Sequence, residues 1–250
     1  MKFDNLDYIW FKILNISNIL LNIAYISEFV PLIFLLFFFK RLKVEKLRYF
    51  FVYICFEALN TSLGLIINNH FRNVQVYEIQ LRIYNIFEYL IISLIIYDNI
   101  TNSVIKNIIR ITIFLFIGFC IYDYFVSKHG VVDFDPVVVE SILINLFLIY
   151  LFFEKINNDD SEFLYQLRIF WIAVALFIYF SGTFFLFLYS RTETKDKAFM
   201  VQYTVIFSSI IIIKNIILLI SILLRKKTLK DNNSIDFASP NFDYSKKNFN

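Results

Sequence analysis

Long apolar segments constrain this chain more than any other feature of its sequence. The clearest one, LRIYNIFEYLIISLIIY at residues 81–97, is apolar almost throughout and carries Glu88 near its centre. A helix needs about 20 mostly apolar residues to cross the hydrocarbon core of a bilayer. The whole chain is 59% hydrophobic, whereas a soluble domain is typically about 45–50% apolar. These features predict an all-α, polytopic membrane protein.

Six further segments share this pattern, and together they predict a seven-helix transmembrane domain over residues 18–224. The predicted spans are residues 18–39, 49–68, 77–97, 107–125, 137–153, 169–189 and 201–224. Pro31 predicts a kink near Ser27. Asp135 and Pro136 are typical of an N-cap and a first helical position.

The two ends of the chain differ in character from the predicted spans. Residues 1–17 fit an N-terminal interfacial segment with Trp10 among the lipid headgroups, or an outward extension of the first span. Both interpretations stay open. Residues 225–250 begin with basic residues and are then rich in Asn, Asp, Ser and Lys. We expect them to form a disordered cytoplasmic tail.

The distribution of Lys and Arg predicts the orientation, because short cytoplasmic loops of membrane proteins are enriched in them. One side of the predicted bundle carries Lys40, Arg41, Lys43, Lys46, Arg48, Lys106, Arg110, Lys155, Arg168, Arg225, Lys226, Lys227 and Lys230. The other side carries Lys2, Lys12, Arg72, Lys128, Arg191, Lys195 and Lys197. The richer side should be cytoplasmic, which places the N-terminus outside and the C-terminus inside.

Most predicted spans carry a polar group near their centre, and these groups form the candidate site. A charged side chain at this depth costs roughly 2.5–3.5 kcal/mol on insertion scales, so it should face the interior of the bundle. The candidate residues are Glu28, Glu57, Glu88, Asn60, Asn85, Asn145, Ser181, Lys214 and Asn215.

Lys214 is the one cation among these midplane groups, and it should be paired with a carboxylate. We expect Glu88 as its first partner and Glu57 as its second. Three carboxylates and one ammonium cannot all be charged and compensated, so at least one Glu should be protonated. The cluster fits a proton-linked or ligand-binding cavity, or a polar core that determines helix packing.

Other polar residues give weaker indications. Glu78 and Arg82 are four residues apart and should form a local pair. Asp123 and Glu140 lie near outer span ends, within reach of the interface.

Several classes of protein are disfavoured. Cys55 and Cys120 both lie in apolar runs, which excludes a disulfide framework, and His70 and His129 are isolated, so we expect no metal and no cofactor. No catalytic motif is present, so we do not expect an enzyme. The basic residues gather at span ends, which indicates contact with the lipid bilayer and no nucleic-acid partner.

Five stretches of the chain carry a family resemblance. They are SEFVPLIFLLFFFKRL at 27–42, FEALN at 56–60, IYNIFEYLIISLIIY at 83–97, FWIAVALFIYFSGTFFLFL at 170–188 and KNIILLI at 214–220. They resemble a largely uncharacterised family of seven-helix inner-membrane proteins from flavobacteria and other Bacteroidetes. Some members stand alone and others precede histidine-kinase modules. The residues that match the family pattern are Glu57, Glu88, Trp171, Ser181, Gly182 and Asn215.

The resemblance implies a sensory or regulatory protein of the bacterial inner membrane, acting through a signalling partner such as a histidine kinase. The seventh span departs from the family pattern, with Phe207 and Ile211 where a His and an Asn are expected.

Two other functions stay open from the residues themselves. The midplane carboxyls fit a proton-coupled transporter or channel component. Lys214 in the seventh span also fits a retinal protein, although Ile210 stands where such a protein should have an Asp.

Overall fold

The computed structural model describes residues 3–42, 47–67, 74–126, 134–157, 164–193 and 197–224, and these residues form helices and no strand. The helices are α1 (Phe3–Leu42), α2 (Arg48–Ile66), α3 (Val74–Asn99), α4 (Ser103–Val126), α5 (Phe134–Asn157), the 3₁₀ turn η2 (Leu164–Gln166), α6 (Arg168–Glu193) and α7 (Lys197–Leu223). His70, His129 and the tail at 225–250 lie outside the described residues.

All seven α-helices are long and apolar enough to span a membrane, with mean hydropathies between 1.4 and 2.5 over their most apolar segments. The predicted all-α fold with seven candidate spans is therefore confirmed. The apolar stretches run over 15–38, 48–66, 78–99, 103–126, 135–157, 168–189 and 198–223. Only a helix or a closed sheet satisfies every backbone polar group within lipid, which explains why such sequences fold as uninterrupted helices.

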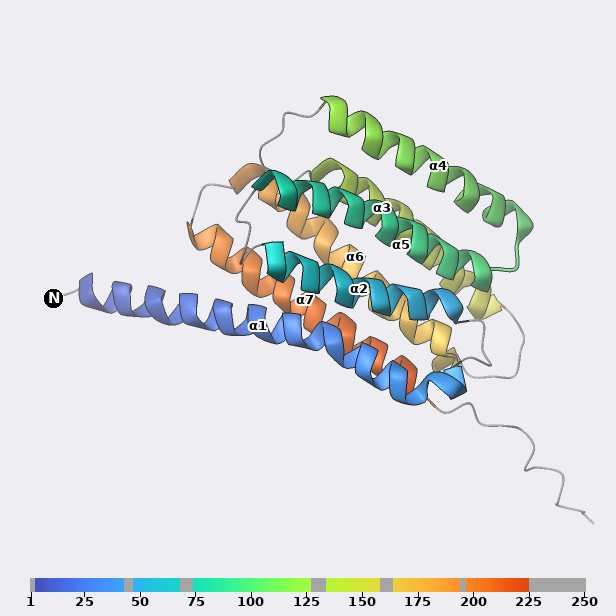
Figure 1. Cartoon of the computed structure of the whole chain (residues 1–250), viewed down its shortest axis with the longest axis horizontal. Coiled ribbons are helices and arrows are strands. Elements are labelled where there is room, and N and C mark those ends of the chain that lie inside the picture. The colour runs from blue at the N-terminus through green and yellow to red at the C-terminus, as the bar shows by residue number, and fades with distance from the viewer. Residues whose placement is uncertain are drawn as a thin grey trace, which may run out of the picture.

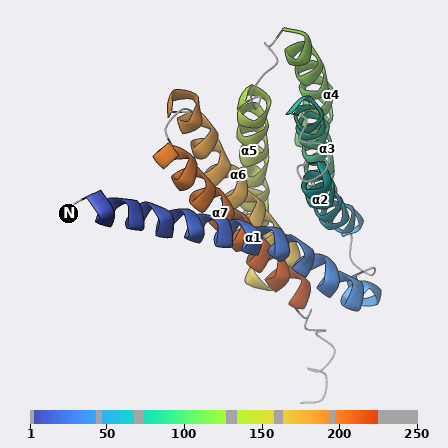
Figure 2. The same cartoon turned by 60° about the vertical axis from the view of Figure 1, so that its left-hand side comes forward.

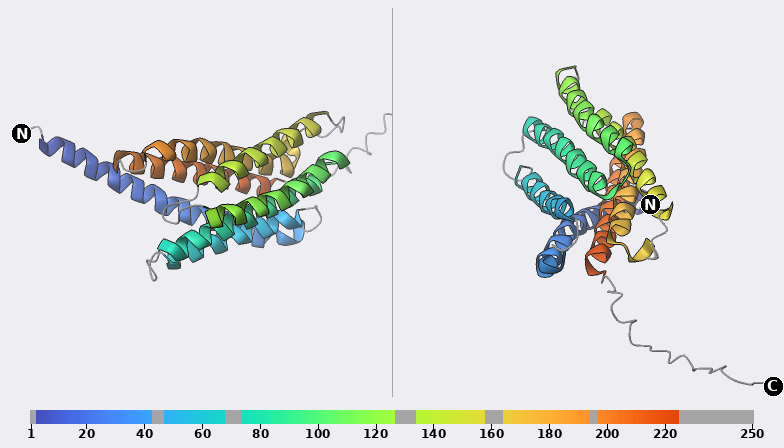
Figure 3. Two further views of the ribbon diagram at one scale, coloured as in Figure 1. Left: turned by 90° about the horizontal axis from the view of Figure 1, so that it is seen from above. Right: turned by 90° about the vertical axis from the view of Figure 1, so that its right-hand side faces the viewer.

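The helices form two layers (Figures 1 and 2). α2, α3 and α4 lie side by side in one layer, and α5, α6 and α7 in the other. α1 packs along α7 and touches α2, while α3 and α4 contact α5, so these contacts join the layers. The view along the bundle shows α2, α3 and α4 following one another in a row (Figure 3).

The outer faces of the helices are apolar. On α4, Phe114 and Leu115 are 72% and 67% exposed. Exposed apolar area of this extent is costly in water and costs nothing in lipid. The exposed faces therefore agree with contact between the helices and a bilayer.

α1 is one continuous helix from Phe3 through Pro31 to Leu42. A proline inside a helix leaves the carbonyl four residues earlier without its backbone donor, and here that carbonyl belongs to Ser27. Ser27 also donates its hydroxyl to the carbonyl of Ala24 at 2.7 Å. This part of α1 thus offers polar groups to α7, which packs against it.

α6 and α7 approach each other closely at Gly182. A Cβ atom at this position would lie 2.6 Å from Cδ1 of Ile210 on α7. Such a separation is shorter than a normal carbon–carbon contact, so Gly182 allows the close packing. Gly118 on α4 differs, because a Cβ atom there would meet nothing within 4 Å.

Hydrogen bonds tie several helix ends together at the end of the bundle where α3 meets α4. The backbone amides of Thr101 and Asn102 donate to the Glu154 carboxylate on α5 at 2.6 and 3.4 Å. The Asn102 side chain caps α4 by accepting from the Val104 amide. Arg168 donates to the Leu224 carbonyl at the end of α7 at 2.6 Å. These bonds satisfy backbone groups that a helix leaves unpaired at its ends.

Candidate functional site: a buried polar network between the two layers

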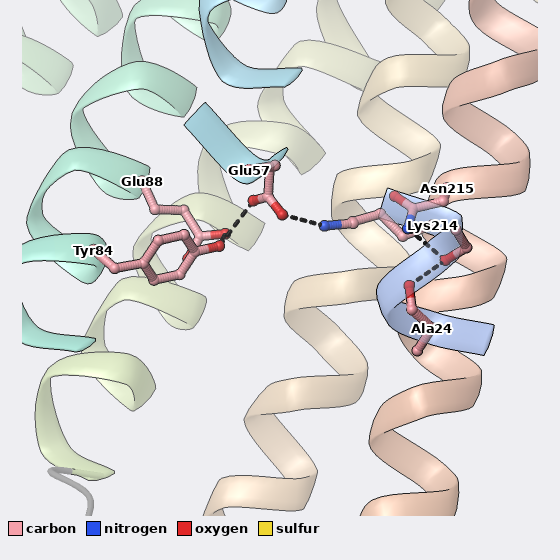
Figure 4. A network of polar contacts seen from close by, with 7 residues as sticks. Ala24, Glu57, Tyr84, Glu88, Lys214 and Asn215 are labelled. Carbon is pink, nitrogen blue, oxygen red and sulfur yellow. Dashed lines mark hydrogen bonds and ion pairs between the residues drawn. The ribbon is translucent and has the colours of Figure 1, made fainter. Parts of the chain in front are cut away.

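Lys214 lies in the interior of the bundle and is only 1% exposed. Its ammonium Nζ lies 2.8 Å from Oε2 of Glu57 on α2 (Figure 4). Glu57 is therefore the direct partner, and the expected first choice, Glu88, is wrong. Depth in the membrane alone does not distinguish the two carboxyls, whereas the placement of α2 across from α7 does. This pair is the one ion pair between the layers among the described residues.

Glu88 joins the network through a tyrosine. The hydroxyl of Tyr84 lies 2.8 Å from Oε1 of Glu57 and 2.7 Å from Oε1 of Glu88. All three side chains are buried. The result is a continuous chain of polar groups from α3 through α2 to α7, as Figure 4 shows.

The single hydroxyl hydrogen of Tyr84 restricts where the protons of this polar network can lie. A tyrosine hydroxyl donates one hydrogen bond, so a carboxylic acid must donate in one of the two contacts of Tyr84. Glu57 faces the ammonium of Lys214 and is best kept as a carboxylate. The geometry therefore assigns the proton to Glu88, which donates to Tyr84, which in turn donates to Glu57. This assignment agrees with the expectation that at least one midplane Glu is protonated.

Two aromatic rings complete the surroundings of the ammonium. Nζ of Lys214 lies 4.6 Å from the ring centroid of Tyr179 on α6 and 5.8 Å from that of Tyr53 on α2. Cations are attracted to the faces of such rings, and the attraction strengthens when water is excluded. The ammonium is thus held by one carboxylate and two aromatic faces.

The tyrosines were not among the candidate residues, although a short repeat indicates two of them. The sequence Tyr-x-x-Phe-Glu occurs at Tyr53–Glu57 and again at Tyr84–Glu88. Residues four apart share one face of a helix, so each Tyr and Glu point the same way. The Phe56 ring of the first copy stacks on the Tyr84 ring of the second, with 5.6 Å between the ring centroids.

Two further carboxyls are buried at the edges of the network. Glu28 on α1 is 9% exposed, and its Oε2 has no hydrogen-bond partner among the described residues. Glu140 on α5 is 1% exposed, and its Oε1 likewise lacks one within the described part of the chain. The expectation that Glu140 reaches the interface is wrong, because it faces inward and interacts electrostatically with Glu88 and Glu57.

The remaining candidate residues form separate contacts. Asn215 on α7 donates to the Ser27 hydroxyl on α1 at 2.9 Å, beside the Lys214 site. Asn60 accepts from Gln80 on α3 at 2.9 Å. Ser181 donates to Asn145 at 3.3 Å, which links α6 to α5.

Asn85 makes no hydrogen bond to any described residue and faces α4. Thus Glu57, Glu88 and Lys214 come together, with Glu28 and Asn215 nearby, while Asn60, Asn85, Asn145 and Ser181 lie outside the network.

Near the N-terminal end of α3, the expected pair of Glu78 and Arg82 is confirmed, with 3.5 Å between Nη2 and Oε1. Arg82 also lies 3.2 Å from Asp123 on α4. Asp123 on α4 is thus paired with Arg82 on α3.

Comparison with known proteins gives no relative. No family model matches the chain, and no curated protein or solved structure is significantly similar to it. Within the described residues no three His, Cys, Asp or Glu side chains are grouped so as to hold a metal ion. The groups of this site, Glu88, Tyr84, Glu57 and Lys214, can exchange protons along the hydrogen bonds that join them.

Proposed function

We propose that this chain is a multi-pass protein of the bacterial inner membrane with a sensory or regulatory role. Its signal would be the relative position of the two helix layers, passed to a signalling partner such as a histidine kinase at the cytoplasmic end. The N-terminus would lie outside and the C-terminus inside, as the distribution of Lys and Arg predicts.

The observation that carries this proposal is the location of the Lys214–Glu57 ion pair between the layers. Removing one member of a buried pair leaves an uncompensated charge, which typically costs about 3–5 kcal/mol. A change in protonation at this point would act in the same way. Local changes in charge affect distant parts of a protein when they shift packed helices from one arrangement to another.

A second candidate function, proton-coupled transport, is favoured by the chain of hydrogen bonds through Tyr84. A transporter must also give its protons access to water on both sides. Glu57, Glu88 and Lys214 are each 6% exposed or less, which favours the regulatory role.

Proteoliposomes with an enclosed pH-sensitive dye separate the two functions. Under an imposed pH gradient, the regulatory protein should leak protons no faster than its Glu57→Gln variant. A flux that is specific to the unmodified protein and lost in the variant would support transport and overturn the proposal.

The regulatory role also predicts an effect at the helix ends. An environment-sensitive fluorophore at Leu223, which is 46% exposed at the end of α7, should change its emission on Glu57→Gln. Unchanged emission would mean that the midplane does not communicate with this end.

A further inference from the structure

A cavity of about 350 Å³ lies between α3, α4 and the start of α5. Its walls are mainly apolar and include Ile83 and Ile86 on α3, Ile121 and Phe125 on α4, and Pro136 on α5. Small-molecule sites usually have volumes of about 300–1,000 Å³ and apolar walls with a few polar groups. The cavity therefore has the size and character of a binding site.

Asn85 supplies an uncharged polar group to the lining of this cavity. Its side chain lines the cavity, is 8% exposed and makes no hydrogen bond to any residue that the structure describes. A buried amide without a partner costs about 1–3 kcal/mol in proteins. A ligand with a hydrogen-bonding group would remove this cost, so Asn85 points to a ligand with one polar group on an apolar body.

Charge at the rim excludes an anionic headgroup. The Arg82 guanidinium lines the cavity but lies 3.5 Å from a Glu78 oxygen and 3.2 Å from an Asp123 oxygen. These three side chains together carry no net positive charge, so a carboxylate or phosphate gains no attraction. Asn85 is uncharged, and its amide both donates and accepts hydrogen bonds. The site therefore favours a neutral polar group.

The cavity opens toward the apolar surroundings of the bundle. Ile83, Ile121 and Phe125 are 50%, 52% and 78% exposed, although they line it. In Figure 3, α4 lies along the margin of the bundle. A molecule dissolved in the bilayer thus reaches the cavity without crossing the protein.

We propose that this cavity binds a neutral single-chain amphiphile from the bilayer. Its hydrocarbon chain lies against the isoleucines of α3 and α4, and its amide, hydroxyl or carbonyl group hydrogen-bonds to Asn85. Tyr84, the residue before Asn85 on α3, belongs to the buried network, so α3 contributes to both the cavity and the network. The binding itself does not depend on the regulatory function proposed above.

Fluorescence quenching in phosphatidylcholine nanodiscs tests the binding directly. The full chain carries Trp10→Phe and Trp171→Phe, with Phe125→Trp as the reporter in the cavity wall. The probe is bromo-undecanamide with bromine on its terminal carbon, because bromine quenches indole on contact. Quenching should saturate at a low mole fraction of the amide. Leu115→Trp is the control reporter, because Leu115 is exposed on α4 outside the cavity. Its quenching should rise linearly with the mole fraction of the amide and should not saturate.

Two further variants and two further probes define the site. Asn85→Leu should weaken binding by about three- to tenfold, the value of one ordinary hydrogen bond. Ile121→Phe adds bulk to the α4 wall of the cavity, keeps Asn85 unchanged and should abolish saturation. The matching bromo-undecanoate and bromo-undecane lack the amide group. Their affinity for the reporter protein with Asn85 should be no higher than the affinity of the amide for the Asn85→Leu variant. Linear quenching at both reporters, unchanged affinity in Asn85→Leu, or tighter binding of the carboxylate would each overturn the proposal.

Discussion

At the scale of single residues, the four members of the central network have different roles. Lys214 and Glu57 form a charged pair at 2.8 Å, while Glu88 contacts the Tyr84 hydroxyl, which also contacts Glu57. If the proton lies on Glu88, a glutamine there replaces the acid with a donor of the same shape. A glutamine at Glu57 instead leaves the Lys214 ammonium without its carboxylate.

The first prediction compares these two carboxyls. Glu57→Gln should lower the free energy of unfolding by about 3–5 kcal/mol because it breaks a buried pair, whereas Glu88→Gln should change it by less than about 1 kcal/mol. Unfolding in mixed micelles with increasing dodecyl sulfate measures both. Equal losses would contradict the assignment of the proton to Glu88.

The second prediction is a double-mutant cycle on Lys214 and Glu57. Lys214→Met should be strongly destabilising alone, and combining it with Glu57→Gln should recover part of the loss, because no uncompensated charge remains. The same cycle with Glu88→Gln serves as the control and should be close to additive. Strict additivity in the Glu57 cycle would mean that the pair does not contribute to stability.

The third prediction concerns the hydroxyl that connects the carboxyls. Tyr84→Phe removes both hydrogen bonds and leaves buried polar atoms unsatisfied, which should cost about 1–3 kcal/mol. Tyr150→Phe on α5 is the control, since its hydroxyl makes no hydrogen bond within the described residues and its loss should have little effect. Melting temperatures in one detergent measure the difference, and similar values would count against a connecting role for Tyr84.

At the scale of helices, contact between α6 and α7 depends on a small residue. Gly182 has the side chain of Ile210 directly above it, whereas Gly118 on α4 has open space. The fourth prediction is that Gly182→Leu lowers the melting temperature markedly while Gly118→Leu does not, because only the first side chain must displace the Ile210 side chain of the neighbouring helix. Helix propensity improves equally in both variants, so equal effects would exclude close packing as the cause.

The helices themselves could be predicted from the sequence because length and hydropathy are local properties. The predicted third span, 77–97, nearly coincides with the apolar stretch 78–99 of α3. The orientation of each helix about its axis was harder to predict. Glu140 faces the interior despite its position near a span end, and Asn85 faces α4 although Tyr84 beside it faces the network.

The partner of Lys214 could not be predicted, because it too depends on how the helices are placed relative to one another. Glu57 and Glu88 occupy equal depths, and only the arrangement of the helices places one of them within reach. The repeated Tyr-x-x-Phe-Glu pattern carries part of this information, because it puts a tyrosine and a glutamate on one face of both α2 and α3.

At the scale of the whole molecule, the orientation in the membrane follows from charge. The fifth prediction is that a green fluorescent reporter fused after Lys230 fluoresces in cells, while alkaline phosphatase fused there is inactive, because the proposed orientation places the C-terminus in the cytoplasm. A fusion after Lys128, between the fourth and fifth predicted spans, should show the opposite pattern. Active phosphatase after Lys230 would reverse the proposed orientation.

The two-layer arrangement explains how the central network can affect the rest of the molecule, because the network lies between the layers. α2, α3 and α4 form one layer, and the charged residue of α7 reaches across to it (Figure 4). A further polar connection between the layers is the pairing of Glu154 with the backbone of Thr101 and Asn102 at the helix ends. Loss of the central pair should therefore loosen the middle of the interface while one end stays joined.

The distance between the layers tests this account most directly. Spin labels at Leu115 on α4 and Phe185 on α6, both exposed, are introduced into a Cys55→Ser, Cys120→Ala background and measured by double electron–electron resonance in nanodiscs. The parent should show one narrow distance distribution, Glu88→Gln should keep it, and Glu57→Gln should shift or broaden it. An unchanged narrow distribution in Glu57→Gln would contradict the claim that the Lys214–Glu57 pair holds the two layers together.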